Sequence, residues 1–382
     1  MPRANSNEIA ISRLQHADHR PDPAAALSMN VVTGYEITRI AFPTSRIIGD
    51  SQVRFDRMAL VVVELKSSGG IAGLGFGTAW APEAELRRAF AHTTAPRLVG
   101  HAPMALLGEV KRPRGGNFLG DPFAEAVNQA LWDLVGKEAG LPLWRLFGGT
   151  TPRTAVYASG LEFRLSDDEA CAFFEKARAR GFRAFKCKVG HEDVRVDIRR
   201  LLTFREIMGP DASMIIDANE AWSAKQAIRR LHSFRDSGLE FEWIEDPCLR
   251  DDIEGLQRIS RETPFTLVCS GEYLEIPDRV RLLHSRAVDV LPLHGDFSGA
   301  LFAARSAGLY GVPVTVGNTP FDVGIHLAAA LPEVLWLEWS MLGWENIPAQ
   351  PIAVEDGYAF APDIPGHGIS ITAETLSDLH AP

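Results

Sequence analysis

The fold is decided by four short apolar stretches that each end in polar residues: FRAFKCKV (182–189), SMIIDAN (213–219), FEWIEDP (241–247) and FTLVCSGE (265–272). Their β-branched and aromatic content is typical of buried strands. The segments between them have the i, i+3, i+4 apolar spacing of amphipathic helices, at 191–208, 223–237 and 251–261. Strands that alternate with helices predict parallel βαβ units.

The alternation continues on both sides of these stretches. Further strands are expected at 154–159, 287–293, 313–318 and 334–339, and further helices at 167–180, 276–285, 298–309 and 321–330. Eight strands with seven intervening helices fit a TIM-like α/β barrel. An open doubly wound sheet would carry a glycine-rich phosphate-binding turn after its first strand, and the sequence has none there.

The residues before the barrel predict a smaller α+β domain. Strand-like runs at 35–42 and 58–65 precede a glycine-rich stretch at 69–77 that indicates turns. Helical spacing then runs from Glu83 to about Ala95, where Pro96 would end it, and resumes over 123–137. The expected parts are a polar tail (1–30), an α+β capping domain (31–148), a barrel (149–352) and a C-terminal segment that packs on the capping domain (353–382).

The composition excludes several classes of protein. Of the 382 residues, 46% are hydrophobic and 23% are charged, which is ordinary for a globular protein. The net charge of −10 argues against a nucleic-acid partner, and no apolar run reaches the ~18 residues of a membrane helix. The N-terminus lacks a signal-peptide pattern, and the four cysteines are scattered. We expect a cytoplasmic protein with reduced thiols and no membrane partner.

Two lysines are expected to point into the barrel. In FKCKV (185–189), Lys186 and Lys188 share one face of the strand, and the three apolar residues share the other. Because the apolar face must pack on the helix layer, the lysines face the barrel interior. Ammonium groups in that position need negatively charged partners. The alternative is a strand end with two solvated lysines.

Three carboxylates, Asp217, Glu245 and Glu272, end the next three strands. The carboxyl ends of barrel strands meet at one mouth, so these acids would repel one another unless a cation lies between them. A ligand set made only of oxygen suits Mg²⁺ better than zinc. The alternative is that each acid pairs separately with an arginine or lysine at the barrel rim.

These motifs resemble the enolase superfamily, and within it the mandelate racemase and muconate lactonizing enzyme branch. The resemblance rests on Lys-Cys-Lys at 186–188, on DAN, IEDP and SGE after the next three strands, and on the flanking stretches 130–149 and 362–369. It implies a (β/α)7β barrel, an N-terminal α+β capping domain completed by the C-terminal tail, one Mg²⁺ per subunit and a homo-oligomer. It also implies removal of the proton α to the carboxylate of a small-molecule substrate, which gives an enediolate.

Carried over residue by residue, the resemblance makes Asp217, Glu245 and Glu272 the metal ligands and Lys188 the base. Lys186 would help to neutralise the substrate carboxylate. The physical chemistry supports this assignment, because a second ammonium two residues away and a divalent cation both lower the pKa of Lys188. The metal and Lys186 would also stabilise the oxyanion charge that appears as the proton leaves.

The sixth and seventh strands depart from the family patterns. The sixth-strand position that carries Asp or Lys in the family falls on His294, and the seventh-strand histidine position falls on Gly317. We expect His294 to face Lys188 across the mouth as an acid or a base. The alternative is a loop histidine hydrogen-bonded to Asp296. His326, in a helix, is expected to be a packing residue with satisfied hydrogen bonds rather than a catalytic one.

Substrate-binding residues are expected at the mouth and in the capping domain. Glu338 matches an eighth-strand position where the family keeps a carboxylate near the substrate, and Asn219 lines the same mouth. Specificity is expected from residues 42–51 and 78–82 of the capping domain, with the candidates Arg46 and Trp80. The alternative is that Arg46 is a surface charge and Trp80 a packing aromatic.

Three reactions can follow an enediolate. It can be reprotonated on the other face (racemase or epimerase), lose a β-hydroxyl (dehydratase), or undergo the reverse of an intramolecular addition (cycloisomerase). Different groups on opposite faces, Lys188 and His294, favour dehydration because a histidine can protonate the departing hydroxide. We therefore expect an acid-sugar or hydroxy-acid dehydratase. The rival hypothesis of another class is a ligand-binding barrel without catalysis.

Overall fold

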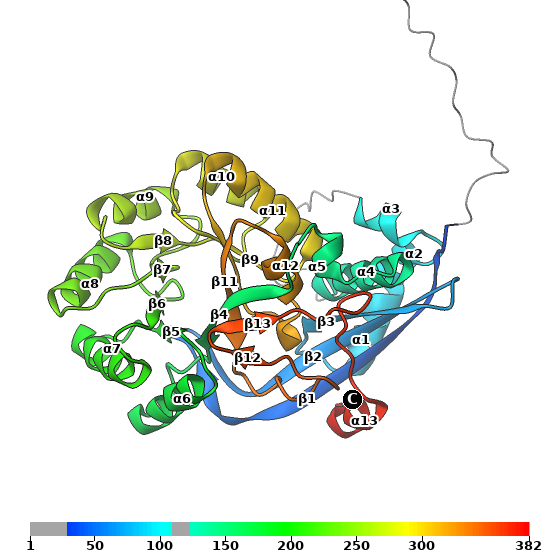
Figure 1. Cartoon of the computed structure of the whole chain (residues 1–382), viewed down its shortest axis with the longest axis horizontal. Helices are drawn as coiled ribbons and strands as arrows, with labels where there is room; N and C mark the ends of the chain where they lie inside the picture. Colours follow the sequence, from blue (N-terminus) through cyan, green and yellow to red (C-terminus); the bar gives the residue numbers. More distant parts are fainter. Residues whose placement is uncertain (1–28, 109–122, 382) are drawn as a thin grey trace, which may run out of the picture.

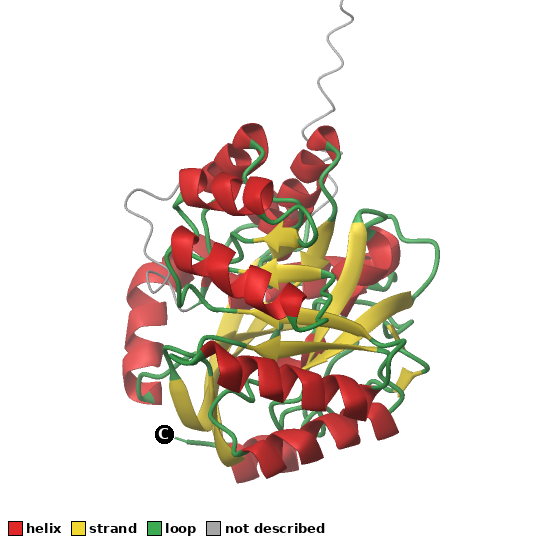
Figure 2. Cartoon of the chain, turned by 90° about the vertical axis from the view of Figure 1, so that its left-hand side faces the viewer, coloured by secondary structure: helices red, strands yellow, loops and turns green. Residues whose placement is uncertain are grey.

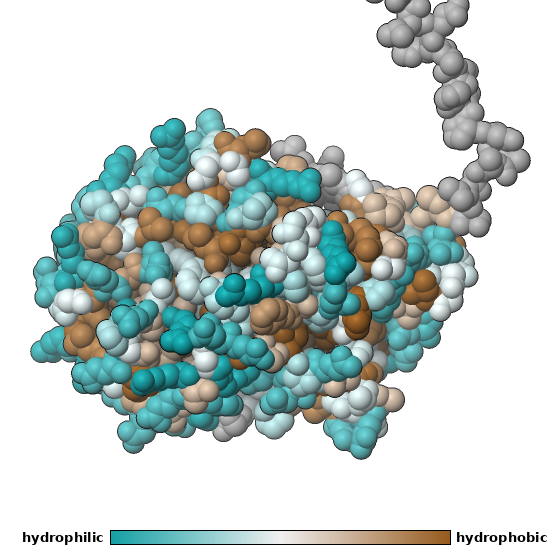
Figure 3. Space-filling view, in the orientation of Figure 1, coloured by the Kyte–Doolittle hydropathy of each residue, from teal (hydrophilic) through white to brown (hydrophobic). Residues whose placement is uncertain are grey.

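The structure of the chain is a computed structural model, which describes residues 29–108 and 123–381. The expected polar tail lies almost entirely outside the described residues. Figure 1 shows a barrel surrounded by helices and a smaller sheet domain beside it. On the face shown in Figure 3, hydrophilic residues cover most of the rim, and hydrophobic residues gather in bands toward the middle. In the described ranges, no helix combines the length and hydrophobicity needed to cross a bilayer.

The capping domain contains a three-stranded antiparallel sheet. Its elements are β1 (Val32–Gly49), β2 (Arg54–Ser67), β3 (Ala72–Thr78), α1 (Glu83–Ala89), η2 (Phe90–Thr94), α2 (Ala95–Leu98), α3 (Pro103–Leu107), α4 (Ala124–Ala139) and α5 (Leu143–Leu146). Side chains alternate along β2, so that Val61 and Val63 join a core with α4. Leu60 and Val62 join the core of the barrel instead. The two faces of the sheet therefore serve two different cores.

Two local expectations are wrong in this domain. The stretch at 69–77 is not all turn, because β3 begins at Ala72. A Cβ on Gly75 would lie 1.8 Å from the carbonyl oxygen of Ala126 in α4, so glycine is needed there for close helix–strand packing. Pro96 does not end the helical run, because it occupies the first turn of α2, where a missing N–H costs no helical hydrogen bond.

The barrel has the eight predicted strands, which are β4 (Arg153–Ser159), β5 (Ala184–Lys188), β6 (Ser213–Asp217), β7 (Trp243–Glu245), β8 (Leu267–Cys269), β9 (Leu291–Leu293), β10 (Val314–Val316) and β11 (Val334–Ser340). They pair in the order β8-β7-β6-β5-β4-β11-β10-β9. A parallel bridge between Cys269 and Val290 joins the two ends of this sheet. Tyr157, Ile215 and Trp243 fill the interior. The predicted TIM-like barrel is confirmed.

Helices surround these strands, as Figure 2 shows. They are α6 (Asp167–Ala179), α7 (Val194–Met208), α8 (Ala224–Asp236), α9 (Ile253–Glu262), α10 (Ile276–Ser285), α11 (Phe297–Tyr310) and α12 (Ile325–Ala330), with the 3₁₀ turn η3 (Pro320–Asp322) before α12. The expected single helix over 321–330 is wrong at its start. Phe321 and Asp322 have φ values of 57° and 55°, a left-handed conformation that interrupts a helix.

The C-terminal segment contacts both domains. Its elements are β12 (Val354–Glu355), β13 (Tyr358–Phe360) and α13 (Ala373–Leu379). The strand β13 pairs antiparallel with β4 of the barrel. Farther along, the His367 N–H donates to Asp133 of α4 at 2.9 Å, and the His380 ring contacts Glu83 of α1 at 2.9 Å. The expected packing on the capping domain is therefore only part of the arrangement, because strand pairing also ties the segment to the barrel.

Candidate active site

The two lysines of β5 lie in the barrel interior, as their alternation predicts. Lys186 is 2% exposed and Lys188 is 7% exposed. Phe185 and Cys187, which alternate with them, pack in the hydrophobic core shared with the surrounding helices. Two ammonium groups are thus held away from solvent and need negative partners.

Those partners come from β6, β7 and β11, which lie one or two strands from β5 around the barrel. Lys186 Nζ lies 2.9 Å from Glu338 Oε1, 3.1 Å from Glu245 Oε1 and 3.3 Å from Asp217 Oδ2. Lys188 Nζ lies 2.5 Å from the same Oδ2 of Asp217. The acids are therefore brought together around the lysines and do not pair separately at the rim.

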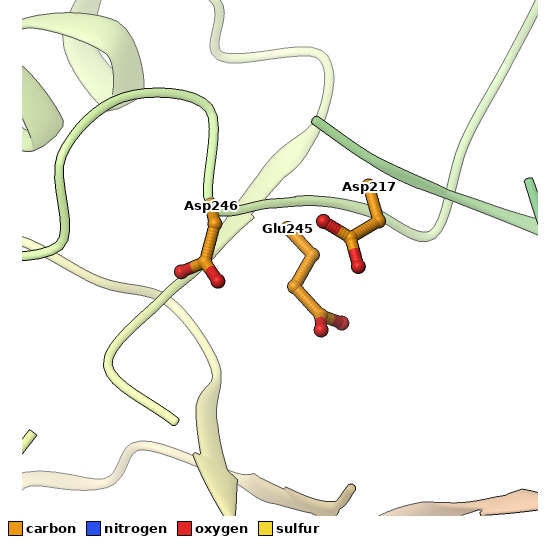
Figure 4. A group of neighbouring side chains, drawn as sticks. All are labelled: Asp217, Glu245 and Asp246. Atoms are coloured by element: carbon orange, nitrogen blue, oxygen red, sulfur yellow. The ribbon is translucent and has the colours of Figure 1, made fainter. Parts of the chain in front are cut away.

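Three carboxylates, Asp217, Glu245 and Asp246, have oxygen atoms within 4.8 Å of one another (Figure 4). The sequence argument did not name Asp246 as a ligand, although it follows Glu245 directly in the IEDP motif. Its carboxylate is already paired: Oδ2 accepts from Arg250 Nε at 2.8 Å, and Oδ1 accepts from the Ser270 hydroxyl at 2.7 Å.

Glu272 is buried beside this group but is not one of its three members. Its Oε1 has no hydrogen-bond partner among the described residues. A Cβ on Gly317 would lie 2.1 Å from that oxygen and 3.1 Å from the carbonyl oxygen of Leu293. Glycine at the seventh-strand position therefore leaves the space that the Glu272 carboxylate occupies.

Two carboxylates at this centre, Glu245 and Glu272, are not fully compensated by the positive charge of the lysines. Burial raises the pKa of Glu245 to about 8, and Asp217 and Glu338 act in the same direction. Burial, followed by Glu338, raises the pKa of Glu272 to about 7. A divalent cation would supply the missing charge, and the donor atoms are all oxygens, which is the ligand type of Mg²⁺. The residues therefore fit the ion that the sequence predicted.

The expectation for the pKa of Lys188 is met only in part. Burial lowers this pKa, and Lys186 lowers it too, but the negative charges of Asp217, Glu338 and Glu245 together hold it above its usual range. Lys186 behaves similarly: burial lowers its pKa, and Glu245 and Glu338 raise it well above its usual range. The acids around the lysines thus decide their protonation.

Two aromatic residues below the mouth orient the acids, and the sequence argument missed both. The Tyr157 hydroxyl donates to Glu338 Oε2 at 3.3 Å, and Trp243 Nε1 donates to Glu245 Oε2 at 3.3 Å. Both lie on strands and alternate into the barrel interior. The alternation of side chains along each strand could have identified both residues as facing the barrel interior.

His294 follows β9, which lies four strands from β5 in either direction around the ring. It and Lys188 therefore end strands on opposite sides of the barrel. The His294 Nδ1 atom lies 3.6 Å from Glu125 Oε2 of α4, and its ring centre lies 5.1 Å from that of Tyr273. Asp296, the alternative partner, is the residue before α11, and no hydrogen bond joins its side chain to His294 in the described part of the chain.

The other predicted residues lie in different surroundings. Asn219 has a φ of 46° next to the acids, and its N–H donates to Asp217 Oδ1 at 2.8 Å. Arg46 instead donates to the carbonyl oxygen of Glu169 in α6 at 2.7 Å. Trp80 is 48% exposed and stacks on Phe55 with 5.4 Å between ring centres. The contacts described for Arg46 and Trp80 are therefore with Glu169 and Phe55, and not with the central acids or lysines.

A loop of the capping domain, Asp50–Val53, reaches the mouth. The Ser51 hydroxyl donates to the carbonyl oxygen of Ala218 at 3.3 Å, and Gln52 Nε2 donates to the carbonyl oxygen of Asn219. Ser51 lies within the predicted range 42–51, and Gln52 lies one residue beyond it. His326 is buried and has hydrogen-bond partners at both ring nitrogens, which agrees with a packing role.

The chain matches two family models. Residues 40–148 match the N-terminal domain of mandelate racemase / muconate lactonizing enzymes, and residues 169–375 match the enolase C-terminal domain-like model. Together these ranges include most of the capping domain and most of the barrel.

Known proteins with similar sequences and structures catalyse several reactions. A 3,6-anhydro-alpha-L-galactonate cycloisomerase of Streptomyces coelicolor is 31% identical over 359 residues, which cover 90% of this chain and 97% of the relative. A crystal structure from Mesorhizobium loti, provisionally named as a mandelate racemase, has a TM-score of 0.88 and 40% identity, with 92% and 94% of the chains covered. The L-talarate dehydratase of Polaromonas sp. JS666, complexed with Mg and L-glucarate, has a TM-score of 0.79 and 26% identity, with 92% and 98% covered.

Proposed function

Because the chain belongs to the mandelate racemase and muconate lactonizing enzyme branch of the enolase superfamily, we propose that it removes the proton α to the carboxylate of a sugar acid in an Mg²⁺-dependent reaction. We propose further that a hydroxyl then leaves the β carbon, so that the enzyme is a dehydratase. The observation that carries this proposal is that Lys188 and His294 end strands on opposite sides of a barrel with buried carboxylates between them.

The proposed ligands of one Mg²⁺ are Asp217, Glu245 and Glu272. Asp246 is also close, but its oxygens already accept from Arg250 and Ser270. Glu272 Oε1 is buried without a hydrogen-bond partner among the described residues, so it is the oxygen that a cation would satisfy. When bound, Mg²⁺ supplies positive charge that polarises the substrate carboxylate and offsets the negative charge of the enediolate.

Lys188 is the proposed base. The α C–H bond breaks, the proton moves to Lys188 Nζ, and the electron pair moves toward the carboxylate to form the enediolate. Lys188 must be neutral before this step. With Asp217 and Glu245 engaged as metal ligands, less negative charge opposes burial and the charge of Lys186, which lower the pKa of Lys188, and Glu338 still raises it. Lys186, held between Glu245 and Glu338, is proposed to pair with the substrate carboxylate.

His294 is the proposed acid. The bond between the β carbon and its hydroxyl oxygen breaks, and the oxygen leaves with the bonding electrons. A proton from His294 converts the leaving group to water. The enol that results rearranges to a 2-keto-3-deoxy acid. Glu338 and Asn219, at the same mouth, are the proposed substrate contacts of the barrel.

A ring-opening cycloisomerisation is the second candidate, and it is favoured by the identity of 31% to a 3,6-anhydro-alpha-L-galactonate cycloisomerase. In an acid of that type, carbon 3 is the β carbon, and the oxygen it carries is the ring oxygen. Its departure needs the same base and the same acid as dehydration, but the leaving oxygen stays attached through carbon 6. The two reactions differ only in whether the leaving oxygen is a hydroxyl or a ring oxygen.

The test is incubation of the protein with Mg²⁺ in D₂O and a panel of aldonic, aldaric and 3,6-anhydro sugar acids, followed by NMR. We expect one open-chain acid to lose its α-proton signal and form a 2-keto-3-deoxy acid. With Lys188→Met, we expect no acid to exchange its α proton or to form this product. Conversion of an anhydro acid alone would establish the cycloisomerase. Exchange with inversion and no elimination would indicate an epimerase, and binding without exchange would indicate a ligand-binding barrel.

A further inference from the structure

The capping-domain helix α4 places a carboxylate on the histidine that follows the sixth barrel strand. Glu125, in the first turn of α4, approaches His294 with Oε2 at 3.6 Å from Nδ1. The two side chains are only 21% and 25% exposed. The sequence offered Asp296, two residues along the chain, as a carboxylate partner of this histidine. The structure provides one from the other domain.

The position of Glu125 is fixed by its neighbour one turn along the helix. Gln129 Nε2 donates to Glu125 Oε1 at 3.0 Å and to the carbonyl oxygen of Gly295 at 3.1 Å. Gln129 Oε1 in turn accepts from the Phe76 N–H of β3 at 2.9 Å. Gln129 is fully buried. One Glu125 oxygen is therefore held by the capping domain, and the other is directed toward His294.

The loop that carries His294 is clamped to the same helix. Asn128 Nδ2 and Trp132 Nε1 donate to the Ser298 hydroxyl at 2.9 Å and 3.0 Å, and the Ser298 N–H donates to Asn128 Oδ1 at 3.2 Å. A Cβ on Gly295 would lie 1.8 Å from Glu125 Oε1, so glycine there permits the close approach. Residues of α4 and residues of the loop after β9 therefore both determine the Glu125–His294 contact.

A histidine whose Nδ1–H faces a carboxylate has its other ring nitrogen, Nε2, free for acid–base work. At 3.6 Å the distance between Glu125 Oε2 and His294 Nδ1 is longer than a hydrogen bond. Contacts of this kind are commonly long without substrate and shorten when substrate binds. The Tyr273 ring packs beside the His294 ring, with 5.1 Å between ring centres and 59° between ring planes.

We propose that Glu125 is a positioning residue for His294, which makes the acid–base group opposite Lys188 a joint product of the capping domain and the barrel. The proposal rests on the proposed function in one respect, because it assigns His294 an acid–base role toward the substrate. It predicts that Glu125 sets the ring tautomer and orientation of His294 and does not itself contact the substrate.

The first test needs no substrate. The full chain is labelled with ¹⁵N-histidine, loaded with Mg²⁺ and examined by long-range ¹H–¹⁵N NMR, with the His294 signals assigned by loss in His294→Gln. We expect the Nδ1–H tautomer in the native protein, and a shift toward Nε2–H in Glu125→Gln. The tautomer should return in Glu125→Asp. An Nε2–H tautomer in the native protein would overturn the proposal without any variant.

Two control variants separate the effect of the Glu125 carboxylate from the effect of docking the His294 loop on α4. Glu138→Gln makes the same chemical change on an exposed part of α4, and Asn128→Ala removes the hydrogen bonds to Ser298. We expect both to leave the His294 tautomer as in the native protein. The same tautomer shift in Asn128→Ala would mean that docking, and not the carboxylate, orients the ring, and the proposal would fail.

The second test uses the sugar acid that the NMR panel identifies. We expect Glu125→Gln to lower kcat by roughly 10²-fold or more, to leave KM within about three-fold, and to retain the α-deuterium exchange that depends on Lys188. If the tautomer shifts but no acid in the panel exchanges, the proposed function fails and the Glu125 assignment stands. If exchange and turnover are normal in Glu125→Gln, the Glu125 assignment fails and the proposed function stands.

Discussion

At the scale of single residues, the two lysines of β5 should be separable by substitution. Lys188→Met removes the proposed base while retaining an apolar stem, so turnover and α-proton exchange should fall together by at least ~10²–10⁴-fold. Lys186→Met should mainly raise KM, because it removes a positive charge that pairs with the substrate carboxylate. Exchange rates in D₂O and steady-state kinetics measure both effects. Small and equal effects in the two variants would mean that neither lysine is the base.

A second prediction distinguishes the two candidates for the third metal ligand. Glu272→Gln should abolish Mg²⁺ binding at millimolar concentration, because it removes a ligand. Asp246→Asn should weaken binding by only about 10–100-fold, the usual effect of residues that hydrogen-bond near a metal site. Titration calorimetry of the EDTA-treated protein measures both affinities. The reverse order would identify Asp246 as the ligand.

Removal of the metal has its own expected result. Because Mg²⁺ should bind the native state and not the unfolded chain, EDTA should lower Tm and stop turnover, and added Mg²⁺ should restore both. In Glu272→Gln, the Tm should not respond to Mg²⁺. Turnover that continues unchanged in EDTA would overturn the metal assignment.

The residues of the mouth were accessible from sequence to different degrees. Asp217, Glu245 and Glu272 could be named because they end successive parallel strands, and such ends converge whatever the details of packing. Glu125 could not, because its contact with His294 depends on how α4 docks against the loop after β9. No spacing in the sequence encodes a contact between residues 125 and 294, which belong to different domains.

At the scale of secondary-structure elements, the packing of β3 on α4 should be sensitive to one methyl group. A Cβ at Gly75 would lie 1.8 Å from a backbone oxygen of α4, and backbone cannot yield as a side chain can. Gly75→Ala should therefore destabilise the protein by about 1–3 kcal/mol. Gly34→Ala, on β1, is the matched control, because its Cβ would meet nothing within 4 Å. Urea denaturation of both variants measures the difference, and equal midpoints would contradict the packing argument.

The glycines of β3 explain why the secondary structure of residues 69–77 was predicted wrongly. A run of glycines is typical of turns, but in β3 the glycines are selected by the closeness of α4, which is a tertiary effect. Pro96 was mistaken for a stop because its position within a helix decides its effect. The eight barrel strands were predicted in the right order, because each one is an apolar run bounded by an amphipathic helix.

At the scale of the whole molecule, three segments meet at the buried imidazole of His326. The ring belongs to α12; its Nδ1 accepts from the Trp144 N–H of α5 at 3.2 Å, and its Nε2–H donates to the carbonyl oxygen of His367 in the C-terminal segment at 2.8 Å. This pattern requires the neutral ring. His326 therefore connects a barrel helix, the last helix of the capping domain and the tail.

This junction should make stability depend on pH. Burial lowers the pKa of His326 to about 3, whereas an unfolded histidine has a pKa of about 6.5. Between these values the unfolded chain binds a proton that the native protein does not. The free energy of unfolding should therefore fall as pH decreases from about 6.5, with a contribution from His326 approaching 1.4 kcal/mol per pH unit. His367, whose pKa burial also lowers, contributes in the same direction.

The contribution of His326 can be isolated by comparing urea midpoints at pH 5.0, 6.0 and 7.5 in native protein, His326→Gln and His92→Gln, all saturated with Mg²⁺. His326→Gln should be less stable than the native protein at pH 7.5, because glutamine cannot bridge the same two backbone groups. The loss should shrink toward pH 5, since glutamine does not bind a proton. His92 is exposed on η2, so its variant should keep the native pH dependence. Parallel curves for the native protein and His326→Gln would show that the junction tolerates a charged ring.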